Sequence, residues 1–153
     1  MTPADLLKRA RTKTARIATA ESCTGGMIIS ALTDIPGSSD VVDRGFVTYS
    51  NAAKTEMLGV SPETLASLGA VSEQVAREMA TGALARSRAT ITVAVTGIAG
   101  SGGSEHKPEG RVCFGIATRD RTHTETVDFG PLGRAEVRAA TVAHALSLIA
   151  AAL

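Results

Sequence analysis

The segment Ala20–Gly26, AESCTGG, places a carboxylate, two hydroxyls, a thiol and two glycines within seven residues. A short apolar run precedes it and a helix-like stretch follows it, so Ser22 is expected at a strand-to-helix turn. Backbone N–H groups at the start of a helix stabilise an oxyanion or bind phosphate, and Gly25 and Gly26 would let a substrate approach them closely. The same pattern is typical of a helix cap formed by Ser22 or Thr24. By itself the segment favours the cap over a catalytic nucleophile.

A serine nucleophile needs a general base, which is usually a histidine or a lysine. No histidine has an evident aspartate partner, and only His106 falls in a loop suited to catalysis; the others are His123 and His144. Lys54, in GFVTYSNAAK, falls in the first turn of a predicted helix, where the helix dipole disfavours a cation and lowers its pKa. Tyr49, the only tyrosine, is expected at the end of the preceding strand, where its phenol can relay or orient a proton. The ordinary alternatives are a solvated lysine and a half-buried tyrosine.

Two further parts of the sequence suit an anionic ligand. The segment Thr96–Gly110 holds five glycines in fifteen residues, TGIAGSGGSEHKPEG, and favours a nest of backbone donors over a plain surface connection. It lacks the Walker pattern GxxxxGKS/T, which excludes a standard P-loop. Arg134 and Arg138 are four residues apart at the start of the last predicted helix, where cations are unfavourable unless an anion binds. They indicate either a phosphate site or a solvated helix face.

The composition argues against several classes of protein. A length of 153 residues predicts one domain spanning residues 1–153. The formal net charge of +1 and the aromatic share of 3% argue against a nucleic-acid-binding surface. The longest apolar stretch, near Ala145–Leu153, is too short to cross a membrane. Cys23 and Cys113 are expected as free thiols, and a cytoplasmic location is expected because the N-terminus lacks the apolar region of a signal peptide. The sequence shows no cluster of metal ligands.

Helix and strand patterns interleave along the chain. The last two strands are separated by a short polar turn, which predicts an antiparallel hairpin. The predicted fold class is therefore a three-layer α/β/α sandwich around a mixed β-sheet, in a single domain. Helices are expected at Ala4–Arg11, Gly25–Thr33, Asn51–Leu58 with Asn51 as the N-cap, a short segment from Ser61, a longer segment capped by Ser72, and Arg134–Leu153, and strands at Arg16–Thr19, Val41–Tyr49, Thr90–Val95, Arg111–Thr118 and Thr122–Phe129.

Four segments, AESCTGG, GFVTYSNAAK, GAVSE and TGIAG…GGSEHKPEG, occur in the order found in the nicotinamide-nucleotide amidohydrolases. From about Leu6 to the final helix the chain resembles this family, which is also called the CinA C-terminal domain family. Longer CinA proteins carry an additional N-terminal domain, and this chain resembles the stand-alone form. The resemblance implies an α/β enzyme that is commonly a homodimer and uses no metal or organic cofactor. It also implies hydrolysis of the carboxamide of nicotinamide mononucleotide to nicotinate mononucleotide and ammonia.

The resemblance further assigns roles to individual residues. Ser22 corresponds to the nucleophile and Lys54 to its general base, with Tyr49 assisting proton transfer. The remaining substrate contacts are implied at Thr24, Gly25 and Gly26 for the oxyanion, at Thr96, Gly97, Ala99 and Gly100 in the glycine-rich segment, and at Arg134 and Arg138 for the phosphate. Glu21 belongs to the first motif, with a structural and an electrostatic role both open, and Cys23 is expected to pack.

The chain departs from the family pattern at two points in the glycine-rich segment. It reads GIAGSGGSE where the family has a proline and one more residue, and it reads KPEG where KPVG is usual, which places Glu109 at a typically apolar position. A different class of function is a nucleotide- or partner-binding module with little or no catalysis, as the link of CinA proteins to DNA uptake and damage response suggests. The joint presence of a serine, a tyrosine and a lysine at the motif positions argues for the enzyme.

Overall fold

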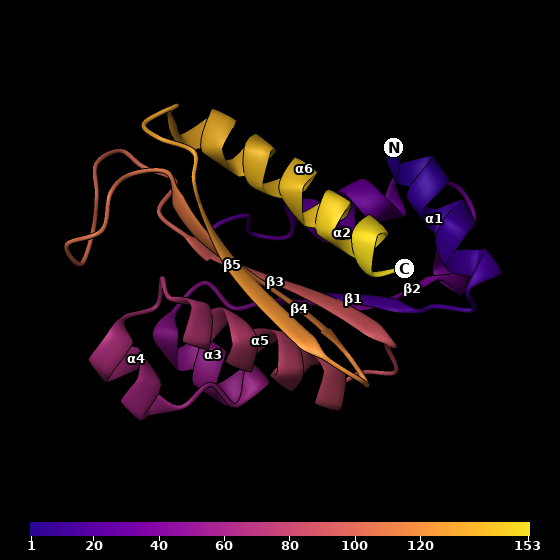
Figure 1. The fold of residues 1–153 in the computed structure, drawn as a ribbon, viewed down its shortest axis with the longest axis horizontal. Coiled ribbons are helices and arrows are strands. Elements are labelled where there is room, and N and C mark those ends of the chain that lie inside the picture. Colours follow the sequence, from indigo (N-terminus) through magenta and orange to yellow (C-terminus); the bar gives the residue numbers. More distant parts are fainter.

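Five strands form a single mixed sheet at the centre of the computed structural model, which describes residues 1–153 (Figure 1). They are β1 (Ile17–Glu21), β2 (Val42–Val47), β3 (Ile91–Gly97), β4 (Arg111–Thr118) and β5 (Thr122–Asp128). The strand order is β2-β1-β3-β4-β5. β1 pairs in parallel with β2 and β3, whereas β4 is antiparallel to both β3 and β5. The predicted mixed sheet and its C-terminal hairpin are therefore confirmed.

Helices cover both faces of this sheet and complete the three predicted layers (Figure 1). One layer consists of α1 (Pro3–Thr12), α2 (Met27–Thr33) and α6 (Arg134–Ala152), and the other of α3 (Asn51–Leu58), α4 (Pro62–Leu68) and α5 (Glu73–Ala85). A short 3-10 helix, η1 (Ser38–Asp40), leads from α2 into β2. The α/β/α sandwich predicted from the sequence is confirmed.

Serine side chains start three of these helices. The hydroxyl of Ser72 accepts from the N–H of Val75 at 3.2 Å and caps α5, and Ser61 caps α4 in the same way, as predicted. α3 differs from the prediction, because its N-cap is Ser50 rather than Asn51. Ser50 has the extended backbone of an N-cap, and its hydroxyl accepts from a backbone N–H at 3.0 Å, whereas Asn51 is already helical.

The turn between β1 and α2 is longer than predicted. Gly25 and Gly26 have positive φ angles of 58° and 105°, so α2 begins at Met27 and not at Gly25. Backbone of this kind lies outside the right-handed helix, and glycine adopts it without steric penalty. β2 also ends earlier than predicted, at Val47, so that Thr48 and Tyr49 leave the sheet.

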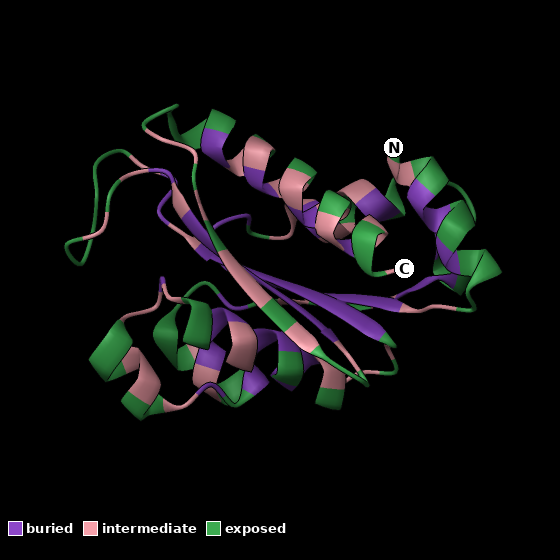
Figure 2. Cartoon of the chain, in the orientation of Figure 1, coloured by how far each residue is buried: buried purple, intermediate pink, exposed green.

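The interior consists of aliphatic side chains on both sides of the sheet (Figure 2). β1 is buried at every position and β3 at all but its last, as expected for central strands that are covered on both faces. Leu6, Phe114 and Ile149 belong to the cluster under α1, α2 and α6. Leu58 and Met79 belong to the cluster under α3 and α5. The two central strands are thus enclosed by helices on both faces.

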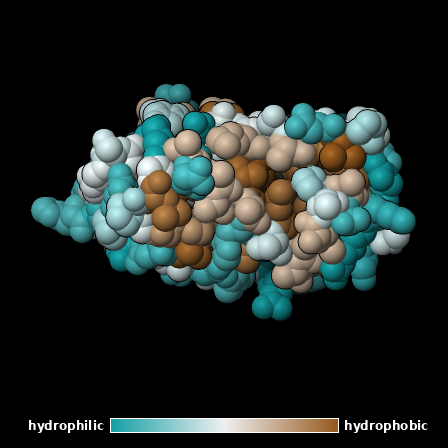
Figure 3. Space-filling model, turned by 90° about the horizontal axis from the view of Figure 1, so that it is seen from above, coloured by the Kyte–Doolittle hydropathy of each residue, from teal (hydrophilic) through white to brown (hydrophobic).

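α6 is long and apolar enough to meet the length and composition criterion for a membrane-spanning helix. It packs against β3, β4, α1 and α2, and buries Val137, Thr141, Ala145 and Ile149, which recur every four residues. Figure 3 looks down on this layer and shows apolar residues interspersed with hydrophilic ones. α6 therefore packs one face against the sheet and the neighbouring helices, while much of the rest of the helix lies at the surface.

Candidate active site

The ends of three parallel strands meet at one edge of the sheet. Glu21, the last residue of β1, pairs with Val47 at the end of β2 and with Val95 near the end of β3. The segments that follow these strands, namely the AESCTGG turn, the start of α3 and the glycine-rich loop, are therefore neighbours. Ligands of open α/β sheets bind outside the carboxyl ends of the strands. The fold brings the separate sequence motifs together at this edge.

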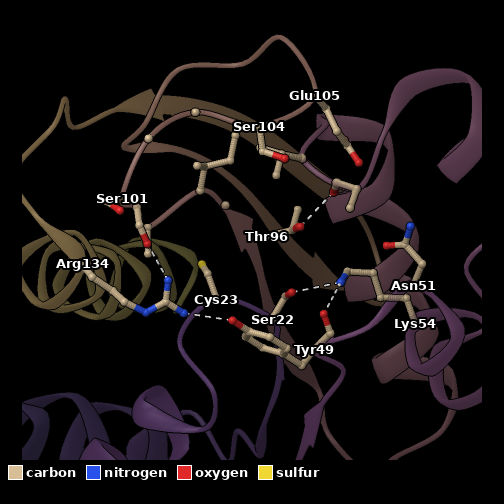
Figure 4. A pocket seen from close by; sticks show the side chains of 18 residues that line it. Ser22, Cys23, Tyr49, Asn51, Lys54, Thr96, Ser101, Ser104, Glu105 and Arg134 are labelled. Carbon is tan, nitrogen blue, oxygen red and sulfur yellow. Dashed lines mark hydrogen bonds between the residues drawn. The ribbon is translucent and has the colours of Figure 1, made fainter.

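Ser22 and Lys54 form the central contact of the site (Figure 4). The Nζ atom of Lys54 lies 2.9 Å from the Oγ atom of Ser22. The ammonium or amine also faces the carbonyl oxygens of Thr48, at 3.0 Å, and of Tyr49, at 3.5 Å. Lys54 is 1% exposed and Ser22 is 7% exposed, so the pair is shielded from bulk water. The solvated lysine considered from the sequence is thus contradicted, and the hydroxyl is not used as a helix cap.

The environment of Lys54 favours its neutral form. Burial lowers the pKa of Lys54 below its usual 10.5, because the charged ammonium loses hydration when it leaves bulk water. No carboxylate forms a salt bridge with it. Since Lys54 is the fourth residue of α3, burial rather than the helix dipole is the main cause of the shift. A neutral amine at this position is able to accept the proton of the Ser22 hydroxyl.

Tyr49 lies beside this pair in a different manner from the one predicted. Its side chain is 63% exposed, and its phenol oxygen accepts a hydrogen bond from Nη2 of Arg134 at 2.9 Å. The backbone carbonyl of Tyr49, and not the phenol, faces Lys54. The expected contact of the phenol with the proton-transfer pair is therefore corrected: in the structure the ring and Arg134 form one wall of the site.

A cavity of about 350 Å³ opens above Ser22 and Lys54. Most of the sequence-predicted residues line it: Ser22, Tyr49, Lys54, Thr96, Gly97, Ala99, Gly100 and Arg134. Those not singled out from the sequence include Asn51, Ala70, Val71, Ile98, Ser101, Ser104 and Glu105. Ala70 and Val71 belong to the GAVSE motif, which is the one signal that pointed to them. Asn51 and Glu105 also lie in quoted motifs, GFVTYSNAAK and GGSEHKPEG, but only the tertiary structure shows that they line the cavity.

The expected oxyanion donors are only partly available. Gly25 donates its N–H to the carbonyl of Ser22 at 3.1 Å, and Gly26 donates its N–H to the carboxylate of Glu21 at 3.2 Å. Thr24 is fully buried and does not line the cavity. The N–H of Cys23 forms no hydrogen bond with another residue, and Cys23 does line the cavity. The donor adjacent to the nucleophile is therefore that of Cys23, and the prediction for Gly25 and Gly26 is corrected.

The two arginines at the start of α6 have different surroundings. Arg134 reaches the cavity, where Nη1 donates to the carbonyl of Gly100 at 2.6 Å. Arg138 does not line the cavity and instead donates to the carbonyls of Cys23, at 3.1 Å, and Thr24, at 3.2 Å. The expectation of a ligand contact thus fits Arg134, whereas Arg138 braces the turn that carries Ser22.

The glycine-rich loop is fixed by its own acidic and basic side chains. Glu109 accepts from the N–H of Gly102 at 2.8 Å, and Lys107 donates to the carbonyls of Leu68 and Val71. Gly100 has a φ angle of 113°, a backbone conformation that favours glycine, and a Cβ atom there would also displace the carboxylate of Glu109. The N–H of Gly102 is consequently satisfied within the protein, which reduces the predicted nest of free donors.

The thiol beside the nucleophile is not activated. Burial raises the pKa of Cys23 to about 11, because the thiolate would lose its hydration. Both cysteines are free, as predicted. Ser22 is thus the nucleophile that the geometry favours, and Cys23 packs with the aliphatic core.

Sequence relatives and solved structures place the chain in a known family. A relative from Enterobacter agglomerans named nicotinamide-nucleotide amidohydrolase PncC is 63% identical over 102 residues, which cover 66% of this chain and 62% of the relative. A putative competence-damage inducible protein from Caldicellulosiruptor bescii is 49% identical over 139 residues, which cover 90% of this chain. The chain spans only 33% of that longer protein.

Two crystal structures have the same fold along nearly the whole chain. The competence/damage inducible protein CihA from Agrobacterium tumefaciens has a TM-score of 0.91 at 52% identity, with 97% of this chain and 94% of that one covered. A CinA superfamily protein from Escherichia coli has a TM-score of 0.94 at 37% identity, with 99% and 88% covered. The family model described as the CinA C-terminal domain matches residues 2–153. The chain belongs to the CinA C-terminal domain family.

Proposed function

We propose that the protein hydrolyses the carboxamide of nicotinamide mononucleotide, with Ser22 as the nucleophile and Lys54 as its base. The observation that carries the proposal is the 2.9 Å contact between a buried lysine amine and a serine hydroxyl at the floor of a cavity. The relative named nicotinamide-nucleotide amidohydrolase supports the choice of substrate. A pure binding module would not need this pair.

The proposed reaction begins with proton transfer from Ser22 to neutral Lys54. The Ser22 oxygen attacks the carboxamide carbon, which the adjacent pyridinium charge makes more electrophilic, and the N–H of Cys23 donates to the oxyanion that forms. Lys54 then gives its proton to the departing nitrogen, which leaves as ammonia. Water, deprotonated by the neutral amine of Lys54, attacks the resulting ester and releases nicotinate mononucleotide. The proton returns to Ser22, and no other co-reactant is needed.

Arg134 is the cationic group proposed to bind the substrate phosphate. It lies at the cavity wall next to the Tyr49 ring, and its two hydrogen bonds, to Gly100 and to the phenol, fix its direction (Figure 4). Arg138 is not given this role because it does not line the cavity and is directed towards the carbonyls of Cys23 and Thr24. A homodimer and a cytoplasmic location complete the proposal, on the basis of the family resemblance.

Replacement of Arg134 by glutamine is expected to raise the KM for nicotinamide mononucleotide about 10- to 100-fold, because a charge-assisted bond to phosphate contributes about 1.5–3 kcal/mol. The effect on kcat is expected to be smaller, since Arg134 does not contact Ser22 or Lys54. Steady-state kinetics with nicotinamide riboside, which lacks the phosphate, provide the control. An equal loss on both substrates would contradict the phosphate contact.

Replacement of Glu109 by valine, the family's usual residue, is expected to raise KM about fivefold in this chain. The change removes the acceptor for Gly102, and a net hydrogen bond is worth about 1 kcal/mol. Glu109→Gln keeps an acceptor oxygen and serves as the matched control, with KM expected near that of the wild type. Identical kinetics of the valine and glutamine variants would show that this bond does not hold the loop.

The experiment that tests the function is an ammonia-release assay on nicotinamide mononucleotide, with the nucleotide product followed by chromatography. One ammonia is expected for each nicotinate mononucleotide formed. Binding of the nucleotide by calorimetry without any ammonia release would contradict the proposal and would favour the alternative, a nucleotide-binding module.

A further inference from the structure

Glu21 has an unusually complete set of partners for a buried carboxylate. Its side chain is 0% exposed. Five groups donate to its two oxygens: the hydroxyls of Thr19 (3.1 Å) and Thr24 (2.6 Å) and the N–H groups of Gly26 (3.2 Å), Ile28 (2.9 Å) and Ile29 (3.0 Å). The three N–H groups can only donate, so the side-chain oxygens of Glu21 accept all three of these bonds. The proposed reaction uses none of these contacts.

These bonds make Glu21 the cap of α2. The N-cap position itself is Gly26, which has no side chain, and no local side chain caps this helix. Ile28 and Ile29 are the second and third residues of α2, the positions whose N–H groups an N-cap side chain normally accepts. The acceptor comes instead from the end of β1, five residues before the N-cap position. The start of α2 is thereby tied to the last strand residue before Ser22.

The backbone of Glu21 is connected to Lys54 through one intervening residue. Its carbonyl accepts from the N–H of Thr48 at 2.8 Å, and the carbonyl of Thr48 accepts from Nζ of Lys54 at 3.0 Å. Ser22 follows directly, with its N–H bonded to Val95 and its carbonyl bonded to the N–H of Gly25. Glu21 therefore acts on both members of the pair. Its side chain holds the turn that carries Ser22, and its main-chain carbonyl holds Thr48, whose own carbonyl contacts Lys54.

We propose that Glu21 is a positioning residue: by capping α2 from the end of β1, its carboxylate fixes the turn in which Ser22 Oγ faces Lys54 Nζ. The inference rests on the Ser22–Lys54 pair of the proposed function. Catalytic groups that are misplaced by about 1 Å lose about 100-fold in rate. Loss of the cap is expected to have an effect of this size without any change in the residues that contact the substrate.

The variants are Glu21→Gln and Glu21→Asp, with Thr92→Val as the matched control. Glutamine keeps the size of the side chain but turns an amide N–H₂ towards N–H donors, and aspartate keeps the charge but is too short to span all five donors. Thr92 is also fully buried, and its hydroxyl donates to the carbonyl of Ala80 at 2.7 Å, on the face of the sheet covered by α5. All rates are measured per folded molecule, well below each variant's unfolding temperature. Should Glu21→Gln not fold, Glu21→Asp carries the test.

Two measurements distinguish a failure of the positioning role from a failure of the proposed substrate. The first is kcat and KM on nicotinamide mononucleotide, where the Glu21 variants are expected to lose about 100-fold in kcat with KM within threefold, and Thr92→Val to keep the wild-type kcat. The second is the rate at which a fluorophosphonate, a general reagent for activated serines, labels Ser22. This rate is expected to fall in the Glu21 variants and not in Thr92→Val.

Each outcome decides between the two ideas. Folded Glu21 variants with wild-type kcat and labelling rates would overturn the positioning role. Equal losses in Thr92→Val would overturn it as well, because they would show a general effect of lost stability. Labelling of wild-type Ser22 without ammonia release would overturn the proposed substrate and leave the inference to be decided by the labelling rates. A wild-type Ser22 that does not react would overturn both.

Discussion

Replacement of Ser22 by alanine is expected to lower the kcat for ammonia release from nicotinamide mononucleotide by about 10,000-fold or more. The reason is that the hydroxyl is the only group in the cavity that is hydrogen-bonded to the buried amine of Lys54 and placed to form a covalent bond. The neighbouring thiol does not substitute for it, because burial raises the pKa of Cys23 to about 11. The measurement is the rate of ammonia release under saturating substrate.

The fold and the affinity of this variant provide the controls. Ser22 contributes one side-chain hydrogen bond, so the free energy of unfolding is expected to change by no more than about 1 kcal/mol. Calorimetry should show nicotinamide mononucleotide bound with nearly unchanged affinity, since the wall that includes Tyr49 and Arg134 is intact. Retained turnover in a folded Ser22→Ala variant would exclude a serine nucleophile at this position.

Replacement of Lys54 by methionine is expected to reduce kcat by a similar factor, because Ser22 then has no base to take its proton. Methionine has nearly the same length and suits the buried position, so the protein should remain folded. The double variant Ser22→Ala/Lys54→Met is expected to be no slower than either single variant, since the two side chains act in the same step. Additive losses would contradict a shared proton transfer.

The pH dependence of the wild type tests the protonation state of Lys54. Burial lowers its pKa below 10.5, and only the neutral amine accepts a proton. Below this lowered pKa Lys54 is an ammonium and inactive, so kcat/KM is expected to rise with pH. The midpoint of the rise lies below pH 10.5, and the rate levels off above that midpoint. The Lys54→Met variant should lack this limb. Rates are taken from pH 6 upward with an enzyme-free blank at each pH, and activity that increases as pH falls would contradict a neutral base.

The sequence predicts the elements of this fold well because their signals are local. Serines before Pro62 and Glu73 are caps with acceptors in reach of the next turn, and both are observed. The short polar turn between the last two strands likewise predicted the hairpin of β4 and β5. The beginning of α2 was misplaced because Gly25 and Gly26 fit a helix start by composition, whereas their positive φ angles depend on what holds the turn.

In the candidate site, too, the sequence predicted individual residues but not the contacts between them. The motifs gave Ser22 and Lys54, but their contact joins residues 32 positions apart and follows from the parallel ends of β1 and β2. The bond between Tyr49 and Arg134 joins residues 85 positions apart, and no spacing in the sequence indicates it. The capping role of Glu21 could not be predicted either, because the N–H groups that donate to its side chain belong to the first turn of α2, whose start the sequence misplaced.

The different surroundings of the two arginines show that the direction of a side chain cannot be predicted without the tertiary structure. Arg134 and Arg138 lie on one face of α6 by spacing, and the sequence treats them alike. In the structure the first meets the cavity wall, while the second meets the carbonyls of Cys23 and Thr24, because the AESCTGG turn passes beside the first turns of α6.

The most direct test of the proposed mechanism is the partition of the reaction between water and hydroxylamine. If the acyl group of nicotinamide mononucleotide is transferred to Ser22 as an ester, with loss of ammonia, hydroxylamine competes with water for that ester, and the corresponding hydroxamate forms at the expense of nicotinate mononucleotide. We expect the hydroxamate to increase with hydroxylamine concentration in the wild type and to be absent in Ser22→Ala. Formation of nicotinate mononucleotide alone at every hydroxylamine concentration would contradict the ester and with it the nucleophilic role of Ser22.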